Sequence, residues 1–198
     1  CCACTTFHIV RNIKFMKQYT LSLLFCITVV MLSCNKESTP PEFSSTDKGS
    51  LELEFDNIAG GEDLALNTAS YTNAVGETFS ISTFKYYISN IVLKNENGTD
   101  YTIPYDESYF LVDESDAAST VVELENIPAG NYTGISFTIG VDSLKCTAPV
   151  EERTGVLDPA GAGAGMYWSW NSGYIFLKME GTSPVTPIWY MKSPIGET

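Results

Sequence analysis

Apolar and polar residues alternate along several short stretches of the chain, with the period of two that is typical of β-strands. Residues 51–56 (LELEFD) alternate strictly and predict a strand with one buried face. Residues 77–93 form the longest such stretch. Strict alternation puts the even-numbered residues of 86–92 on one face and the odd-numbered residues of 87–93 on the other. Because both faces are partly apolar, we predict a central strand and not an edge strand.

Turn signals separate these strands. Asn97-Gly98 is the strongest short-range hairpin signal, and it leads into a short strand at 101–103. Further short strands are expected at residues 108–112, 120–124, 132–139, 174–179 and 188–191. Regular spacing with little helical periodicity predicts an all-β fold, a single antiparallel β-sandwich of immunoglobulin-like or Greek-key style. Because the last strand begins just before the chain stops, we expect the C-terminus to be truncated.

The N-terminal part has the pattern of an export signal. Residues 16–33 combine a basic start at Lys17 with an apolar run of about a dozen residues, which is typical of a secretory signal peptide. A membrane span would need roughly 20 apolar residues. The run closes on Ser33-Cys34, which resembles a bacterial lipobox, so we expect lipidation at Cys34. An ordinary signal peptide that contains a cysteine is the alternative.

These features divide the chain into four parts. Residues 1–15 are expected to be a non-native upstream segment and are left out of the fold prediction. Residues 16–33 form the lipoprotein signal peptide. Residues 34–49, rich in Ser, Thr, Pro and Glu, predict a flexible tether. Residues 50–198 form the β-sandwich domain, which we expect at the cell envelope, anchored to the outer membrane or facing the periplasm.

Removal of the leader changes the charge and the reactive side chains. The 11 basic and 24 acidic residues become 8 and 24, a net charge of −16, which argues against nucleic acids and anionic lipids as partners. Cys146 is the only cysteine after Cys34, so no internal disulfide is expected. The single histidine, His8, precedes the leader. Its loss excludes Ser-His-Asp and Cys-His catalysis and the commonest metal ligand.

An aromatic stretch, residues 165–181 (GMYWSWNSGYIFLKMEG), follows a long loop at 145–165 that shows no strand pattern. So long a connection is usually functional. Alternation places Trp168 and Trp170 on one face with Met166, which suits either a core stripe of the sandwich or a pocket of soft ligands. The sulfur atoms of Met166, Met179 and Cys146 prefer Cu(I) to hard cations.

Carboxylates offer weaker candidates for chemistry. The loop at 113–116 (DESD), with Asp142 and Asp158, could offer oxygens to Ca²⁺, but the spacing of an EF-hand is absent. Glu151 and Glu152 are adjacent, and neighbouring side chains normally point apart, so acid–base work of the glycosidase kind is not expected. We therefore predict no enzyme activity and no catalytic residues.

Several segments together resemble the MbnP-like family, the exported copper-binding proteins associated with methanobactin operons, and its lipoprotein branch in Bacteroidetes-type bacteria. The matching segments are residues 84–91 (FKYYISNI), 127–132 (IPAGNY), 137–143 (FTIGVDS), 157–159 (LDP), 165–170 (GMYWSW) and 173–176 (GYIF). The order of the segments, together with the run Met-x-Trp-x-Trp-x-x-Gly-Tyr, makes the resemblance specific. It covers residues 50–181.

The resemblance implies an exported protein that binds copper. In such proteins a partner di-haem enzyme oxidises a tryptophan to kynurenine, and this product helps to ligate Cu(I) beside histidines. Trp168 and Trp170 match the tryptophan motif, and together with Met166 they are the candidate metal residues. Residues 34–198 contain no histidine, so none can match the family's ligands. Either these ligands lie beyond Thr198, or this branch has kept the fold without the metal.

A second function is compatible with the same pattern. Aromatic side chains on a surface sandwich can line a sugar platform, so an adhesin-like or glycan-binding protein without metal is the alternative. Exposed coplanar aromatic rings would favour that alternative, and deep burial would favour a role in the core.

Overall fold

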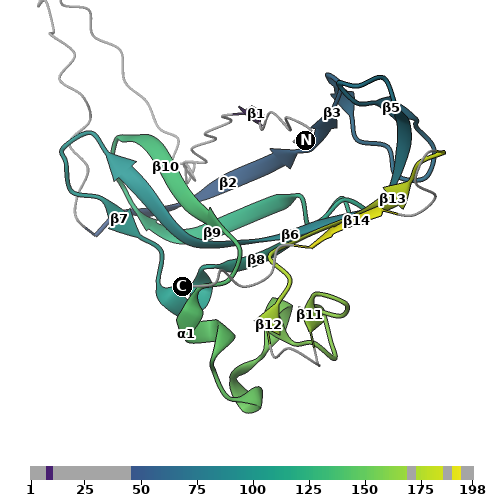
Figure 1. The fold of residues 1–198 in the computed structure, drawn as a ribbon. Helices are drawn as coiled ribbons and strands as arrows, with labels where there is room; N and C mark the ends of the chain where they lie inside the picture. The colour runs from purple at the N-terminus through teal and green to yellow at the C-terminus, as the bar shows by residue number, and fades with distance from the viewer. Residues whose placement is uncertain (1–7, 11–45, 169–172, 185–188, 193–198) are drawn as a thin grey trace, which may run out of the picture.

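The computed structural model describes residues 8–10, 46–168, 173–184 and 189–192. Cys34, the whole predicted signal peptide and the predicted tether up to residue 45 lie outside these ranges. Figure 1 shows two layers of antiparallel strands with a small appendage below them. The strands are β1 (His8–Val10), β2 (Lys48–Asp56), β3 (Ile58–Ala59), β4 (Glu62–Asp63), β5 (Tyr71–Thr72), β6 (Thr78–Asn95), β7 (Tyr101–Thr102), β8 (Tyr109–Asp113), β9 (Val121–Pro128), β10 (Tyr132–Ile139), β11 (Tyr167–Trp168), β12 (Gly173–Tyr174), β13 (Leu177–Thr182) and β14 (Trp189–Lys192).

Strand β6, 18 residues long, organises the larger sheet. Its partners are β5, β7 and β8 along one edge and β13 and β10, end to end, along the other, while β14 extends the sheet beyond β13. The backbone of Tyr87 marks the point where β13 gives way to β10. Its N–H donates to the Phe176 carbonyl at 3.0 Å, and its carbonyl accepts from the Gly140 N–H at 2.8 Å. The prediction of a central strand is confirmed.

A β-bulge at Asn90 divides β6 into two halves. Asn90 has φ = 53°, in the left-handed region that Asn tolerates better than most residues. Opposite it the register of β10 shifts between Ser136 and Thr138. The bulge turns the peptide groups of Ile91 toward the edge that carries β7, where its carbonyl accepts from the Ile103 N–H at 3.0 Å. Without an extra residue, Ile91 and Tyr87 would face the same edge.

The bulge also corrects the predicted faces of this strand. Tyr86 and Ile88 pack into the main core, as do Ile91 and Leu93, whereas Tyr87 packs on the opposite face. The prediction that Ile91 and Leu93 share the face of Tyr87 is therefore wrong. An inserted residue exchanges the two faces of everything that follows it, because side chains alternate with a period of two.

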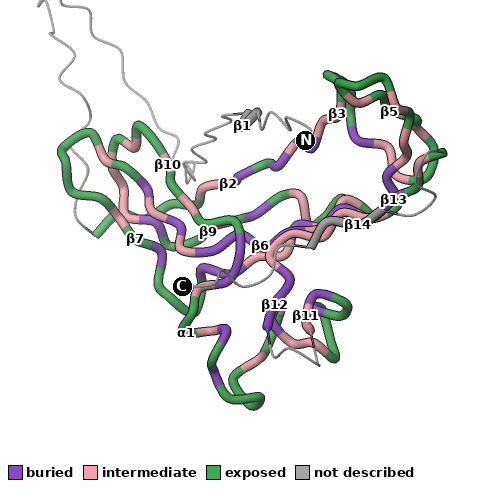
Figure 2. Tube along the Cα trace, in the orientation of Figure 1, coloured by how far each residue is buried: buried purple, intermediate pink, exposed green. Residues whose placement is uncertain are grey.

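The smaller sheet, β1-β2-β9, covers one face of the larger sheet. Leu53 and Phe55 of β2 and Val122 and Leu124 of β9 point inward and alternate with exposed residues, as the pattern of residues 51–56 predicts. Figure 2 shows the buried positions following β6 through the middle of the molecule. The main core lies between the two sheets, and the all-β sandwich is confirmed.

A short chain of polar groups crosses this core. The Tyr86 hydroxyl donates to Asn57 Oδ1 at 2.9 Å, and Asn57 Nδ2 donates to Glu114 Oε2 at 2.8 Å. Tyr86 and Asn57 are buried, and Glu114 is half-buried. Burial, together with the nearby carboxylates of Asp56, Asp63 and Asp113, raises the pKa of Glu114 despite the hydrogen bond from Asn57.

The chain leaves the larger sheet after Gly140 and returns at Phe176, and we call residues 141–176 the excursion. It forms the lower appendage in Figure 1 and holds α1 (Ser143–Cys146), the 3₁₀ turns η2 (Val150–Glu152) and η3 (Gly155–Leu157), and the ribbon of β11 and β12. The predicted loop thus contains no strand before Tyr167, but it has helical turns. In the described part of the chain, no helix is long and apolar enough to span a membrane.

Candidate functional site

The aromatic stretch forms a two-stranded ribbon. Tyr167 lies opposite Tyr174 and Trp168 opposite Gly173, and the Ile175 N–H donates to the Met166 carbonyl at 2.9 Å. Met166 is fully buried and Trp168 is half-buried. Trp170 lies outside the described residues. The predicted strand at 174–179 is divided, because Tyr174 belongs to this ribbon and Leu177 starts β13.

The ribbon packs on a second hydrophobic cluster, separate from the main core. Its buried members are Tyr87, Tyr109, Val141, Cys146, Leu157, Met166, Tyr174 and Ile175, and Trp168 packs against them. A core stripe of the sandwich was one of the two alternatives for Met166 and Trp168, and these residues do not lie in the main core between the two sheets. The stretch instead packs against the other face of β6, where Tyr87 points away from the main core.

Three tyrosine rings, two in the ribbon and one in β6, fix the ribbon to the larger sheet. The rings of Tyr167 and Tyr174 meet edge to face with centroids 5.1 Å apart, and those of Tyr174 and Tyr87 meet in the same way at 5.7 Å. The Tyr174 hydroxyl donates to the Leu157 carbonyl at 2.8 Å, and the Tyr87 hydroxyl donates to the Val156 carbonyl at 3.0 Å. Burial raises the pKa of Tyr174 to about 12, so the phenol stays protonated and remains a donor.

Gly163 lets the loop pass close to these groups. A Cβ atom on it would lie 2.6 Å from the Val156 carbonyl oxygen and 2.9 Å from the Tyr87 hydroxyl. Its carbonyl also accepts from the Met166 N–H at 3.0 Å. Gly163 of the Gly-Ala run at 160–165 therefore allows close packing of the loop and helps to place Met166 in the cluster.

Two other side chains complete the surroundings of the ribbon. The Arg153 guanidinium lies over the Tyr167 ring, 4.7 Å from its centroid, and donates to the Ala148 carbonyl at 3.1 Å. Cys146 is buried, forms no disulfide and donates to the Val141 carbonyl at 3.4 Å. Burial raises the pKa of the Cys146 thiol, so it stays protonated.

The donors in this cluster do not make a copper site on their own. Met166 supplies a thioether and Cys146 a protonated thiol, and copper prefers thiolate, thioether and imidazole. Among the residues that the structure describes, no group of three or more His, Cys, Asp or Glu side chains could hold a metal. The predicted set of Trp168, Trp170 and Met166 stays a prediction, and the structure places two of its members, Met166 and Trp168, in the same hydrophobic cluster.

Asp142, one of the carboxylates considered above as an oxygen donor for Ca²⁺, joins neighbouring elements through hydrogen bonds. It accepts from the hydroxyls of Tyr109 and Tyr105, the latter at 2.9 Å, and from the N–H of Leu144 at 3.0 Å. Although burial opposes it, these hydrogen bonds hold the pKa of Asp142 below its usual range. The Lys145 ammonium lies over the rings of both tyrosines.

The remaining acidic candidates also have local partners. Asp113 forms an ion pair with Lys85 at 2.6 Å and accepts from Ser115. Asp158 caps a turn by accepting from the Ala160 N–H at 2.9 Å. Asp113 and Asp158 are therefore used in turns and ion pairs, while Glu151 and Glu152 are exposed.

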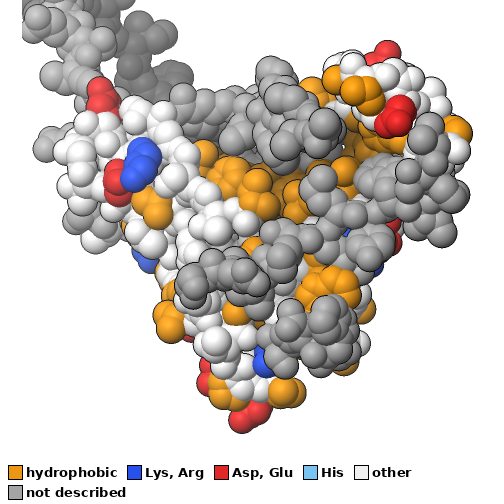
Figure 3. Space-filling view, viewed as in Figure 1, with side chains coloured by type: hydrophobic (Ala, Val, Ile, Leu, Met, Phe, Trp, Pro, Cys, Tyr) orange, Lys and Arg blue, Asp and Glu red, His pale blue; other side chains and the backbone are white. Residues whose placement is uncertain are grey.

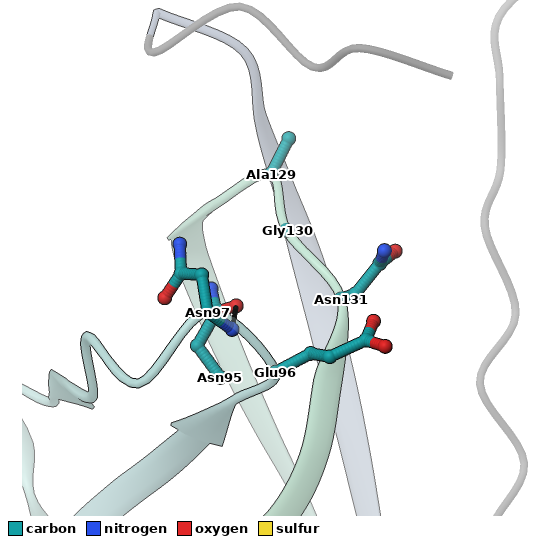
Figure 4. Close-up of a pocket in the computed structure, with 6 residues that line it drawn as sticks. All are labelled: Asn95, Glu96, Asn97, Ala129, Gly130 and Asn131. Carbon is teal, nitrogen blue, oxygen red and sulfur yellow. Dashed lines mark hydrogen bonds between the residues drawn. The ribbon is translucent and has the colours of Figure 1, made fainter. Parts of the chain in front are cut away.

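A shallow depression of about 340 Å³ lies far along the sheet from the ribbon, lined by Asn95, Glu96, Asn97, Ala129, Gly130 and Asn131 (Figure 4). Its asparagines shape turns. Asn95 Oδ1 accepts from the Asn97 N–H at 3.1 Å, and Asn97 Oδ1 accepts from the Thr99 N–H at 2.8 Å. The pairing of β6 with β7 on either side of this turn confirms the predicted Asn-Gly hairpin.

The two β-layers and the ribbon carried beneath them define an all-β sandwich protein with an inserted aromatic site. The MbnP family model matches residues 48–197, and the chain belongs to the MbnP family. The solved structure of MbnP from Methylosinus trichosporium is similar, with a TM-score of 0.51 and 18% identity over 77% of this chain and 63% of that chain. The chain therefore spans less than two thirds of that protein. No curated protein matches.

The sequence pattern indicated the aromatic stretch but not the residues that fix it to the sheet. Tyr87, Leu157 and Gly163 lie far from the tryptophans in the sequence or in an unpatterned loop. One signal was available for Tyr87, because it is a large aromatic residue on the second face of a strand whose first face is already apolar.

Proposed function

We propose that this protein is an exported, lipid-anchored binding protein that handles copper, as Cu(I), at the cell envelope. Membership of the MbnP family supports this proposal. The observation that carries it is that Met166 and Trp168 belong to one hydrophobic cluster, in which the Met166 thioether is buried together with Tyr87 and Tyr174. A thioether in apolar surroundings favours Cu(I) over Cu(II) and over hard cations. We propose no catalytic activity.

A competition titration with a chromophoric Cu(I) chelator tests the metal. We expect the full chain to bind Cu(I), and Met166→Leu to weaken binding by about tenfold or more, which corresponds to about 1.4 kcal/mol. Met179→Leu is the matched control, because Met179 packs in the main core and both changes conserve volume. Absence of Cu(I) binding, or equal losses in the two variants, would contradict the proposal.

The family resemblance adds a modified tryptophan and a partner. We propose that a di-haem enzyme oxidises Trp168 or Trp170. Fragmentation mass spectrometry of the peptide that holds both residues, from protein isolated from its native envelope, tests this step. An oxidised product at one of the two positions is expected, and two intact indoles would remove this part of the proposal.

The anchor is tested separately. We expect the full chain to take up a labelled fatty acid and to fractionate with membranes, and Cys34→Ala to lose both properties. A Cys34→Ala protein that stays in the membrane fraction would instead point to an ordinary signal peptide and another means of attachment.

The glycan-binding alternative receives no support from the ribbon. The Tyr167 and Tyr174 rings are inclined at 79°, and Tyr174 is buried. In the described part of the aromatic stretch, these rings do not form a coplanar platform on which a sugar could stack.

A further inference from the structure

Two tyrosines share one carboxylate where the excursion leaves the larger sheet. The Tyr105 hydroxyl donates to Asp142 Oδ1 at 2.9 Å, and the Tyr109 hydroxyl donates to Asp142 Oδ2. The two rings meet edge to face, with centroids 5.5 Å apart. Tyr105 belongs to η1 (Tyr105–Glu107) and Tyr109 to β8, and Asp142 is the N-cap of α1. We call Tyr105 and Tyr109, with Asp142 between their hydroxyls, the tyrosine pair.

The tyrosine pair reaches from solvent into the second hydrophobic cluster. Tyr105 is 40% exposed, whereas Tyr109 is buried. Tyr109 is a member of the cluster against which Trp168 packs. Figure 3, in which tyrosine is coloured with the hydrophobic residues, shows such side chains reaching the surface at the lower end of the molecule. One ring of the pair is therefore accessible from outside, and the other lies in the cluster that holds the ribbon.

Aromatic rings continue from Tyr109 to the ribbon. Tyr87 lies opposite Leu111, two residues beyond Tyr109 in β8, so Tyr87 and Tyr109 are diagonal neighbours on one face of the sheet. From Tyr87, the edge-to-face contacts described above lead through Tyr174 to β11, the strand that contains Trp168. A line of phenol rings thus joins the surface at Tyr105 to the ribbon.

The phenols in this line differ in what can accept their protons. A phenol loses an electron more readily when its proton can pass to a base in the same step, and a carboxylate is such a base. Asp142 serves both members of the tyrosine pair. The hydroxyls of Tyr87 and Tyr174 donate instead to backbone carbonyls, which do not take up a proton at neutral pH. An oxidised tyrosine can therefore form at the tyrosine pair more readily than deeper in the cluster.

Lys145 makes release of the proton necessary. Its ammonium lies 5.3 Å from the centroid of the Tyr105 ring and 5.8 Å from that of the Tyr109 ring. A cation in this position favours the electron-rich neutral ring. It opposes a ring that has lost an electron and kept its proton, because that ring is itself a cation. Oxidation of either tyrosine must therefore transfer the proton to Asp142.

We propose that the tyrosine pair carries single oxidising equivalents from an external one-electron oxidant, such as a high-valent metal centre, to the indole of Trp168. Tyr105 gives one electron to the oxidant and its proton to Asp142 Oδ1, and becomes a neutral radical. Tyr109 then gives one electron to Tyr105 and its proton to Asp142 Oδ2, while Oδ1 returns a proton to Tyr105. In the last step Trp168 gives one electron to Tyr109, Oδ2 returns the proton, and the indole is left as a radical cation.

A photochemical oxidant tests this path without a partner protein. The inference rests on the proposed oxidation of a tryptophan, but it does not depend on copper. The full chain is mixed with tris(bipyridine)ruthenium(II) and an electron acceptor, and a light flash produces the ruthenium(III) oxidant. Transient absorption at neutral pH should show a fast phase of tyrosyl radical formation. This phase should be slower in D₂O, because a proton moves with the electron.

Tyrosine variants locate the radical. Tyr105→Phe should slow the fast phase by about tenfold or more, because the exposed member of the pair has lost its hydroxyl. Tyr109→Phe should also remove onward transfer to the indole. Tyr132→Phe is the matched control, because the Tyr132 hydroxyl donates to the Pro128 carbonyl at 2.8 Å and not to a carboxylate. We expect this control to leave the fast phase in place.

Asp142→Asn tests the proton acceptor. An amide is not a base, so the fast phase should slow by about tenfold or more. Hydrogen bonds hold the pKa of Asp142 below its usual range, so the parent should lose the fast phase only below about pH 4. The other titratable groups near this carboxylate are Asp106 of η1 and Lys145 and Cys146 of α1. Asp106→Asn should keep the fast phase, because Asp106 bonds to Lys145.

Trp168→Phe tests the onward transfer. In the parent the tyrosyl signal should decay as an indole radical appears, and the variant should lengthen its lifetime by about tenfold or more. Trp189→Phe is the control, because β14 pairs with β13 in the larger sheet. Absence of the fast phase, a fast phase that Asp142→Asn leaves unchanged, or equal effects of the two tryptophan variants would overturn the proposal. Intact indoles in the native protein, with these phases present, would count against the proposed tryptophan oxidation and leave the electron path standing.

Discussion

The hydroxyl of Tyr174 donates a 2.8 Å hydrogen bond to the carbonyl oxygen of Leu157, and both residues are almost completely buried. Tyr87 binds the carbonyl of the preceding residue, Val156, from β6. Two phenols thus hold neighbouring peptide groups of the excursion. One phenol belongs to the ribbon and the other to the sheet, so the aromatic site and the sandwich are fixed to the same short stretch of backbone.

Tyr174→Phe removes this bond and leaves the Leu157 carbonyl buried without its donor. We expect the free energy of unfolding to fall by about 1–3 kcal/mol, the usual range for an unsatisfied buried polar group. Urea unfolding followed by fluorescence measures it. Tyr167→Phe is the control, because Tyr167 is half-buried and its ring contacts do not need the hydroxyl. Equal losses in the two variants would show that the bond to Leu157 contributes little.

Gly163→Ala tests the close approach of loop and sheet. The new methyl group would overlap the Val156 carbonyl oxygen, so we expect a loss of roughly 1–3 kcal/mol in unfolding free energy. Gly49→Ala is the control, because a Cβ there meets nothing within 4 Å, and we expect a change within about 0.5 kcal/mol. Thermal unfolding of both variants distinguishes a packing requirement from a general effect of replacing glycine.

Asp142→Asn tests the hydrogen bonds that the Asp142 carboxylate accepts from Tyr105, Tyr109 and Leu144. Because folding lowers the pKa of Asp142, its carboxylate stabilises the protein above the unfolded pKa of about 3.9, and this contribution is lost as the pH falls further. The variant should be less stable than the parent at pH 7, by about 1–3 kcal/mol. The difference should close below about pH 4. A gap that is constant from pH 7 to pH 3 would exclude a role for the charge.

Glu114→Gln should change the free energy of unfolding in the opposite direction, and so stabilise the protein at pH 7. Folding raises the pKa of Glu114, so its charged form is disfavoured in the folded state, and lowering the pH through the folded pKa relieves that cost. The glutamine keeps an oxygen for Asn57 Nδ2 and carries no charge. We expect the variant to be more stable than the parent at pH 7, with an advantage that shrinks as the pH falls. Glu125→Gln, at an exposed position of β9, is the control.

Much of the sandwich could be predicted because its signals are local. The alternation at 51–56 and the Asn97-Gly98 turn each depend on a few neighbouring residues, and both appear in the structure. The bulge at Asn90 could not be predicted, because nothing in the surrounding pattern marks an inserted residue. The bulge is defined only by the pairing of β6 with β10 and by the packing of β6 in the main core.

The candidate site was predicted less completely than the fold, for a related reason. Met166 and Trp168 stand out as a soft and aromatic pair by type alone. Their placement depends on packing with Tyr87, in a strand far earlier in the chain, and with Leu157, in a loop that has no strand pattern. Composition therefore identified the ribbon, but only the tertiary contacts show that it belongs to a second core.

The two backbone hydrogen bonds of Tyr87 fix both ends of the excursion. One residue receives the chain as it departs, at Gly140, and holds it as it returns, at Phe176. A Cβ on Gly140 would lie 2.9 Å from the Phe176 ring, so the two ends of the excursion also touch each other. The excursion is thus an insertion whose two ends are held at one position of the larger sheet. A change in its length or in its exposed side chains therefore need not alter the register of the larger sheet, because both ends stay bonded to the backbone of Tyr87.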